Sequence, residues 1–245
     1  MTPIRIAFAF LTRLPVGRAG DDAARMPRAL AFFPLVGFAL GGLLAGAAWV
    51  LAPFGQPLVA AVVLVALHAL VTGGLHLDGV SDWFDAVGGG RGDRQRMLEI
   101  MRDPHAGAHG MAALCLVLIA KVVLFAALLG SSAIAPWVVM PAAARAAVVP
   151  VVALFPAARS DGLARAVASG KPAGALIAAV AWMALATAAF GVWPVGAALA
   201  AAVCVALAVG LWARARLGGV TGDVHGAAIE LSEIAFAFAW LVASR

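Results

Sequence analysis

The chain has 245 residues, of which 64% are hydrophobic and only 12% are Asp, Glu, Lys or Arg, and it contains no tyrosine. Soluble domains carry about 25% charged residues, so this composition, with a mean hydropathy of +1.02, excludes an ordinary soluble domain and indicates an integral membrane protein. The formal net charge of +5 does not indicate a nucleic-acid-binding protein, because most arginines adjoin apolar runs, where membrane topology explains them.

The first 30 residues carry five arginines among apolar positions. They contain no uninterrupted apolar stretch followed by a small-residue cleavage site, so no removable signal peptide is predicted. The two cysteines, Cys115 and Cys204, both lie inside apolar runs. We expect them to pack as small hydrophobic side chains rather than to form a disulfide or bind a metal.

Seven apolar runs are long enough to cross a hydrocarbon core, which takes roughly 20 helical residues. They predict an all-α, polytopic membrane helical bundle of about seven transmembrane helices, plus a short amphipathic surface helix, in a single membrane-embedded domain over residues 1–245. The predicted spans are residues 31–52, 57–75, 110–130, 134–155, 173–190, 193–212 and 227–243.

The basic residues predict the orientation of these spans. If the connections alternate sides, one side holds residues 1–30, 76–109, 156–172 and 213–226, with 14 of the 17 Lys and Arg residues, whereas the other side holds only Arg245. The positive-inside rule then predicts a cell inner membrane protein with its N-terminus inside and its C-terminus outside. Ten of the 12 acidic residues also fall on the inner side, so we expect the active site to face the cytoplasm.

The stretch HLDGVSDWFD, residues 76–85, concentrates acidic residues after the second span. Asp78, Asp82 and Asp85 stand at i, i+4 and i+7, which on a helix places them within an arc of roughly 60°. Three neighbouring carboxylates repel one another unless a cation offsets them, and hard oxygen ligands suit Mg²⁺. The alternative is a solvated acidic turn after a span. Three glycines at 88–90 are expected to stop this helix.

Residues 91–110, RGDRQRMLEIMRDPHAGAHG, predict the short amphipathic helix, with Asp93 as N-cap and Pro104 beyond its end. We expect it to lie at the membrane surface. The arginines at 91, 94, 96 and 102 are suited either to anionic substrate groups or to lipid headgroups. Asp103, followed by His105 and His109, belongs either to a proton-transfer site or to a polar loop.

A third group of acidic residues opens the last span. Asp223, Glu230 and Glu233 stand at i, i+7 and i+10, on one side of a helix if the helix is continuous through Gly222 and Gly226 at its start. Ionisable residues at the start of a span indicate function. The alternative is that the two glutamates form structural ion pairs with Arg145 or Lys121, the two basic residues inside spans, which are equally suited to bind phosphate. His68, among Ala and Leu, is expected in the core.

Carboxylates that can hold a metal, beside basic side chains at a membrane surface, are typical of enzymes that transfer or hydrolyse phosphate-linked groups. The residue pattern alone does not name a substrate.

Five segments, in this order in a polytopic chain, resemble the cobalamin synthase family, adenosylcobinamide-GDP ribazoletransferases. They are FLTRLPV at 10–16, FFPLVGFALGG at 32–42, GLHLDGVSDWFDAVGGG at 74–90, RMLEIMRDPHAGAHG at 96–110 and GGVTGDVHGAAIELSE at 218–233. The resemblance implies a late step of cobalamin (vitamin B12) biosynthesis: Mg²⁺-dependent joining of adenosylcobinamide-GDP to α-ribazole or its 5′-phosphate, with release of GMP. The implied partners are these two substrates and the lipid bilayer, without nucleic acid. A homo-oligomer and an association with other corrinoid enzymes both stay open.

The resemblance also implies roles for single residues. Asp78, Asp82 and Asp85 would form the metal face, with Asp82, His76 and Asp103 in catalysis. The residues expected to bind substrate are Arg13, Arg102, Arg145, Asp223, Glu230 and Glu233. The base that accepts the ribose hydroxyl proton is left open between His76, His105 and an aspartate. Two positions, His105 and His225, depart from the family pattern, which weakens a histidine as base.

Two other functions fit parts of the sequence. A CDP-alcohol phosphotransferase also uses clustered aspartates on membrane helices, but SDGLARAV at 160–167 has one residue too few between Gly162 and its Ala-Arg pair, and HLDGVSDWFD lacks that pair. A cation transporter would use intramembrane carboxylates, yet the spans before the last carry almost none.

Overall fold

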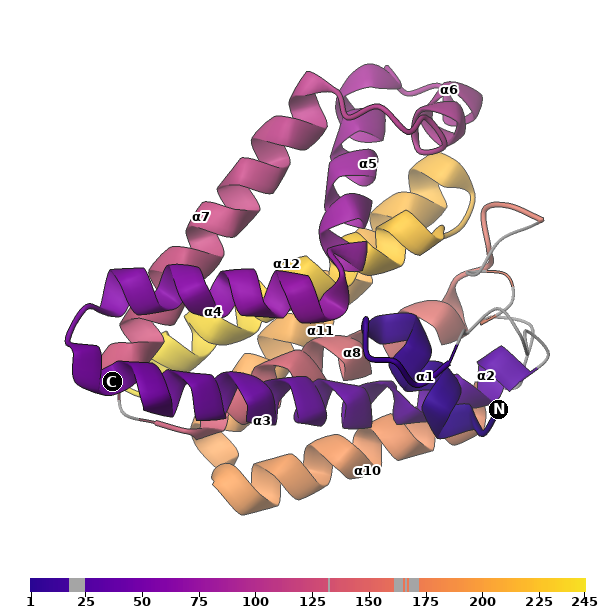
Figure 1. Cartoon of the computed structure of the whole chain (residues 1–245). Coiled ribbons are helices and arrows are strands. Elements are labelled where there is room, and N and C mark those ends of the chain that lie inside the picture. The colour runs from indigo at the N-terminus through magenta and orange to yellow at the C-terminus, as the bar shows by residue number, and fades with distance from the viewer. Residues whose placement is uncertain (18–24, 132, 161–164, 166, 168–171) are drawn as a thin grey trace.

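The computed structural model describes residues 1–17, 25–131, 133–160, 165, 167 and 172–245, and over these residues it contains helices and one isolated backbone bridge but no strand (Figure 1). In chain order the helices are α1 Pro3–Leu11, α2 Met26–Ala29, η2 Leu30–Phe32, α3 Phe33–Leu51, η3 Ala52–Phe54, α4 Pro57–Thr72, α5 Leu75–Gly89, α6 Arg94–Ile100, α7 Ala108–Gly130, α8 Ala135–Leu154, α10 Ala173–Phe190, α11 Val192–Leu217 and α12 Gly222–Ala243.

Each of the seven predicted spans contains one long helix. Six described segments are long and apolar enough to cross a membrane, namely Met26–Phe54, α7, α8, α10, α11 and α12, and α4 with α5 makes a seventh if that bent pair counts as one span. The multi-pass, all-α architecture is therefore confirmed. Two predicted boundaries were too short: α11 continues to Leu217 and α12 begins at Gly222. Basic residues in the last turn of α11, Arg214 and Arg216, complement the negative end of the helix dipole and favour that extension.

The centre of the bundle is α8, which is buried almost throughout. It packs against α3, α10, α11 and α12, and Figure 1 shows α3 and α10 running alongside it. Gly37 and Gly41 of α3 allow the closest approach, because a Cβ atom at these positions would lie 2.3 Å from the backbone of α8. Small residues four apart are a common way to bring membrane helices together.

The acidic helix α5 leaves the end of α4 at an angle of 92°. Two consecutive glycines, Gly73 and Gly74, make this corner, with left-handed φ angles of +66° and +69° that favour glycine. From there α5 packs between α7 and α12 and carries α6 at its far end (Figure 1). The corner thus sets the aspartates of α5 against the first turn of α12.

The predicted amphipathic helix is confirmed as α6. The carboxylate of Asp93 accepts hydrogen bonds from the backbone N–H groups of Gln95 and Arg96, at 2.8 and 3.1 Å, as a predicted N-cap should. Met97 and Met101 are buried beneath the helix. The glycines at 88–90 end α5, also as predicted.

Two further features differ from the prediction or were missed. No separate element is predicted before the first span, but α1 forms there. The backbone N–H of Arg13 donates to the carbonyl of Val71 at 2.7 Å, which ties the end of α1 to the α4–α5 corner. Cys115 and Cys204 are exposed rather than packed in the core. Their positions on α7 and α11 turn them away from the neighbouring helices, a direction that an apolar run alone does not reveal.

Candidate active site

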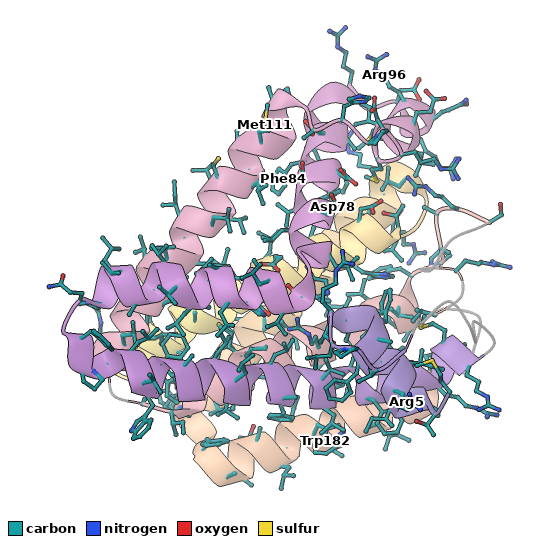
Figure 2. The ribbon with its side chains drawn as sticks, in the orientation of Figure 1. Arg5, Asp78, Phe84, Arg96, Met111 and Trp182 are labelled. Atoms are coloured by element: carbon teal, nitrogen blue, oxygen red, sulfur yellow. The ribbon has the colours of Figure 1, made fainter. Side chains whose placement is uncertain are left out.

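The aspartates of α5 stand on one helix, as the spacing predicts, and α12 adds a fourth carboxylate. Asp82 lies within electrostatic range of Asp78, Asp85 and Asp223. Figure 2 shows Asp78 on the side of α5 where the end of α12 lies. Gly79 makes this proximity possible, because a Cβ atom there would lie 2.7 Å from the carbonyl oxygen of Asp223. Asp223 sits in the first turn of a continuous α12, so Gly222 and Gly226 do not interrupt that helix.

The carboxylate of Asp85 is engaged differently from the others. Its two oxygens accept hydrogen bonds from the backbone N–H groups of Gly107, at 2.7 Å, and Gly110, at 2.8 Å. Gly107 is the N-cap of α7, where the helix dipole favours a negative charge. A side chain at either glycine would collide with the carboxylate. Asp85 therefore fastens α5 to the start of α7.

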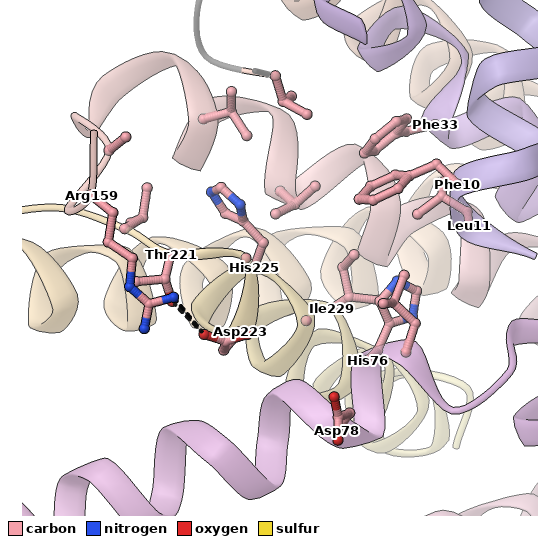
Figure 3. Close-up of a pocket in the computed structure, with 18 of the residues that line it drawn as sticks. Phe10, Leu11, Phe33, His76, Asp78, Arg159, Thr221, Asp223, His225 and Ile229 are labelled. Carbon is pink, nitrogen blue, oxygen red and sulfur yellow. Dashed lines mark hydrogen bonds and ion pairs between the residues drawn. The ribbon is translucent and has the colours of Figure 1, made fainter. Parts of the chain in front are cut away.

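An arginine that the sequence did not single out stands beside Asp223. The Nη1 atom of Arg159 lies 3.8 Å from Oδ2 of Asp223 (Figure 3), and its Nη2 donates to the carbonyl of Leu98 at 3.0 Å. Thr221 caps α12 by accepting from the N–H of Val224 at 3.2 Å and also donates to Asp223 at 3.2 Å. Arg159 follows a span, where the positive-inside rule accounts for an arginine. Nothing in the neighbouring sequence indicates that it contacts Asp223.

The segments that carry Arg159 and Asp223 are joined through their backbones. Ala157 and Val220 form a parallel bridge, in which Ala158 donates to Val220 at 2.9 Å and Val220 donates to Pro156 at 2.8 Å. The bridge holds the loop after α8 against the turn before α12. Arg159 and Asp223 therefore lie next to each other.

These residues open onto a cavity of about 380 Å³, which we call the acidic cavity. Helices α1, α3, α5, α8 and α12 and the loops beside them surround it. The polar residues that line it are His76, Asp78, Arg102, Arg159, Thr221, Asp223 and His225, and the apolar ones include Phe10, Leu11, Phe33, Val148, Val152 and Ile229 (Figure 3). A carboxylate pair and two arginines at one end of a largely apolar cavity suit a ligand that is partly anionic and partly apolar.

A broader hollow of about 730 Å³ adjoins the acidic cavity. We call it the Arg13 hollow, after the arginine that lines it with Thr12, Thr72 and Ser81. Asp78, Phe10 and Leu75 line both spaces. Asp78 is thus the carboxylate that stands between two places where ligands can bind.

The two glutamates of α12 form the structural ion pairs that the sequence left as an alternative. Lys121 contacts Glu230 and lies 2.7 Å from Glu233, and Arg145 donates to Glu233 at 2.9 Å. Each of the four side chains is at most 4% exposed. His68 lies in the same interior cluster, 3.6 Å from Glu233, as expected of a core residue. Arg145, Glu230 and Glu233 line neither the acidic cavity nor the Arg13 hollow.

The remaining predicted site residues are divided. His76 and Arg102 line the acidic cavity, whereas Asp103 lines neither space. Asp103 is 55% exposed and binds His105, accepting from its backbone N–H at 3.0 Å and contacting its ring at 2.7 Å. These hydrogen bonds hold the pKa of Asp103 below its usual value. Arg96 lies on the outer surface at the α6 end (Figure 2).

Among the described residues, no three His, Cys, Asp or Glu side chains stand close enough together to surround a metal ion. Mg²⁺ usually takes only one or two protein carboxylates and completes its shell with water and substrate phosphate oxygens. The carboxylates of Asp78, Asp82 and Asp223 are ligands of that type. Asp85 has less to offer, since both of its oxygens already accept backbone hydrogen bonds.

Comparison with known proteins identifies the family of the chain. A family model described as cobalamin-5-phosphate synthase matches residues 3–241. The chain belongs to this family.

Three relatives carry the name adenosylcobinamide-GDP ribazoletransferase. The one from Alkalilimnicola ehrlichii is 44% identical over 238 residues, covering 94% of this chain and 91% of the relative. The one from Pseudomonas syringae is 41% identical over 238 residues, covering 96% and 97%. The one from Roseiflexus is 40% identical over 233 residues, covering 95% and 86%. No solved structure matches the chain.

Proposed function

We propose that this chain joins adenosylcobinamide-GDP to α-ribazole, or to α-ribazole 5′-phosphate, in the last stage of cobalamin biosynthesis. The observation that carries the proposal is the family match over residues 3–241, with relatives that bear this name at 40% identity or more over nearly their whole length. The acidic cavity supports it, because it combines carboxylates and arginines of the kind used in phosphoryl transfer.

In the proposed reaction, a ribose hydroxyl of α-ribazole attacks the cobinamide-side phosphorus of the pyrophosphate. A new oxygen–phosphorus bond forms, the bond from that phosphorus to the bridging oxygen breaks, and GMP leaves with the bridging oxygen. The hydroxyl proton passes to a base. The protein has to hold the two reactants in line and to stabilise the charge on the leaving phosphate.

One or two of the carboxylates of Asp78, Asp82 and Asp223 are proposed to hold Mg²⁺, with water and substrate phosphate oxygens completing its shell, and Asp85 is proposed to position α5. Bound there, the ion would neutralise charge on the pyrophosphate oxygens. Asp78 and Asp223 line the acidic cavity, and Asp82 stands next to both. Their oxygens have no backbone N–H partner comparable to those of Asp85 among the described contacts.

The chain's own cations would then hold the phosphates. Arg159, which lies 3.8 Å from Asp223, and Arg102 both line the cavity, and a guanidinium group matches the geometry of phosphate oxygens. Of the three kinds of base left open by the sequence, His105 is 88% exposed and lies outside the cavity. His76, Asp78 and Asp223 line it, so we propose that one of them accepts the proton.

We also propose that the site faces the cytoplasm in the cell inner membrane. The residues that line the cavity come partly from α1, the loop after α6, the loop after α8 and the turn before α12, which belong to the segments 1–30, 76–109, 156–172 and 213–226 that hold 14 of the 17 Lys and Arg residues. Positive charge marks the cytoplasmic side of a membrane protein.

The proposal is tested with purified protein in liposomes, Mg²⁺, adenosylcobinamide-GDP and α-ribazole. We expect equal amounts of corrinoid product and GMP, measured by chromatography. Omission of α-ribazole should stop GMP release, which separates transfer from hydrolysis. Product formed only from CDP-linked alcohols would overturn the proposal in favour of a lipid phosphotransferase. The SDGLARAV segment considered for that class lies largely outside the described residues.

A further inference from the structure

Three side chains that line the acidic cavity have buried polar atoms without a hydrogen-bond partner. They are both ring nitrogens of His76, Nε2 of His225 and Nε of Arg159. Buried polar atoms in folded proteins nearly always have a partner. His76 is only 3% exposed, and Figure 3 shows it on α5 with His225 on the neighbouring α12. Because Nδ1 of His76 lies 4.0 Å from the carboxylate of Glu230, the atoms left for a ligand in the cavity are Nε2 of His76, Nε2 of His225 and Nε of Arg159.

A large part of the cavity wall is apolar and partly aromatic. The rings of Phe10 and Phe33 pack in a tilted pair at a centroid distance of 5.9 Å, and Val148, Val152 and Ile229 add to this part with exposed fractions of 7% or less. Such a wall favours a flat, largely uncharged ring. The charged groups Asp78, Asp223 and Arg159 stand beside it, so a ligand that joins an aromatic ring to hydroxyl or phosphate groups matches the whole cavity.

Size distinguishes between the two proposed substrates. The cavity volume of about 380 Å³ lies near the lower end of small-molecule sites, which span about 300 to 1,000 Å³. α-Ribazole is a bicyclic aromatic base on a ribose and has this scale. Adenosylcobinamide-GDP is a corrin macrocycle with two nucleoside groups and is far too large to enter.

We infer that the acidic cavity binds the ribazole nucleoside, and this rests on the proposed function. Its aromatic base lies against Phe10, Phe33 and the valines of α8, with its one unsubstituted ring nitrogen facing the imidazoles of His76 and His225. Its ribose lies at the carboxylate end. The pyrophosphate of the corrinoid substrate then approaches from the Arg13 hollow, and the two reactants meet at Asp78, which lines both spaces.

Guanine is the competing occupant, since the GDP portion also carries a flat ring. The edge of guanine presents several hydrogen-bond donors and acceptors, which a buried site has to satisfy. Apart from the carboxylates and arginines that are proposed to bind the metal and the phosphates, the polar side chains of the lining are two imidazoles and Thr221. This composition favours the less polar benzimidazole-type base.

The test compares Val152→Phe, which fills the cavity from α8, with Leu154→Phe on the same helix, where the side chain is 61% exposed. The variants are reconstituted in nanodiscs, and binding of α-ribazole alone and of GMP alone is measured by calorimetry. KM is then measured for each substrate. For Val152→Phe we expect α-ribazole binding to weaken, and its KM to rise, by about tenfold or more, with GMP binding and the KM for adenosylcobinamide-GDP unchanged. Leu154→Phe should match the wild type.

A rise in the KM for adenosylcobinamide-GDP and weaker GMP binding, with α-ribazole binding intact, would assign the cavity to guanine and overturn the inference. Phe10→Ala, on the peripheral helix α1, provides a second test that does not crowd the bundle. It should weaken α-ribazole binding by about fivefold, and unchanged binding in both variants would overturn the inference. Failure of the wild type to form product from both substrates would instead refute the proposed function.

Discussion

At the residue scale, aspartates from one motif differ in what surrounds them. Helical spacing predicts that Asp78, Asp82 and Asp85 share a face of α5. Spacing does not reveal which groups of the neighbouring helices each carboxylate contacts. Asp85 meets the amide groups at the start of α7, whereas Asp78 meets a cavity. The same limit applies to Glu230 and Glu233, whose partners on α7 and α8 are far away in sequence.

Asp82→Asn should remove activity while leaving the fold intact. The change takes away one negative charge next to Asp78 and Asp223 and makes no space or clash. We expect GMP release to fall by about 100-fold or more, the scale seen when a preorganised electrostatic group is lost. Glu99→Gln, at an exposed acidic residue on α6, is the matched control and should stay near wild type. Wild-type turnover by Asp82→Asn would refute the proposed metal face.

Asp85→Asn should act on stability. An asparagine side chain has one acceptor oxygen, so one of the N–H groups of Gly107 and Gly110 loses its partner in a largely buried place. We expect a loss of about 1–3 kcal/mol in the free energy of unfolding, visible as a lower melting temperature in detergent. An unchanged melting temperature with activity abolished would show that the charge serves the reaction instead.

At the element scale, the sequence predicted the helices well and the corners poorly. Long apolar runs and the N-cap at Asp93 are local signals, so the spans and α6 could be located. The short helix α1 is too brief and too interrupted by arginine to resemble a span. Gly73 and Gly74 are a local signal for a break between α4 and α5, but the 92° angle of that break depends on how α5 packs against α7 and α12. The cavity, and with it Arg159, follows from that packing.

Gly79→Ala tests the contact between α5 and α12. A methyl group at this position would lie 2.7 Å from the carbonyl oxygen of Asp223, so the two helices have to separate and the carboxylates of the site move apart. We expect kcat/KM to fall by at least about tenfold. Gly42→Ala is the control, because nothing lies within 4 Å of its new methyl group. That variant should gain about 0.5–1 kcal/mol from helix propensity and keep full activity. Equal activity of the two variants would contradict the close contact.

At the scale of the whole molecule, one neutral cluster connects the middle of the bundle. Lys121 of α7, Arg145 of α8 and two glutamates of α12 balance two positive and two negative charges. His68 of α4 borders the same cluster. Because each charge is compensated only by residues on other helices, the cluster specifies how these helices are arranged.

Lys121→Met should destabilise the protein, because it leaves Glu230 without its main cation. Removing one partner of a buried pair costs about 3–5 kcal/mol. Adding Glu230→Gln to the same chain should recover much of the loss, since the uncompensated charge is gone. Thermal unfolding of the single and double variants measures the coupling. A double variant no more stable than Lys121→Met would argue that the pair does not act as a unit.

Topology gives a further prediction for the whole chain. A reporter fused after Arg245 or inserted at Gly191 should behave as periplasmic, and one inserted at Gly92 should behave as cytoplasmic, because the arginines gather on the side of α6. Phosphatase and fluorescent-protein fusions read the two sides independently. A cytoplasmic signal at Arg245 would mean that α4 with α5 does not count as a crossing.

The bridge between Ala157 and Val220 makes the geometry of the site depend on one glycine. Arg159 and Asp223 come from distant parts of the sequence, and two amide-to-carbonyl bonds join the loops that carry them. A Cβ atom at Gly219 would lie 2.3 Å from the carbonyl oxygen of Pro156, so the two loops can approach this closely only while position 219 has no side chain. The guanidinium and the carboxylate are thus kept together through a residue that lines neither the acidic cavity nor the Arg13 hollow.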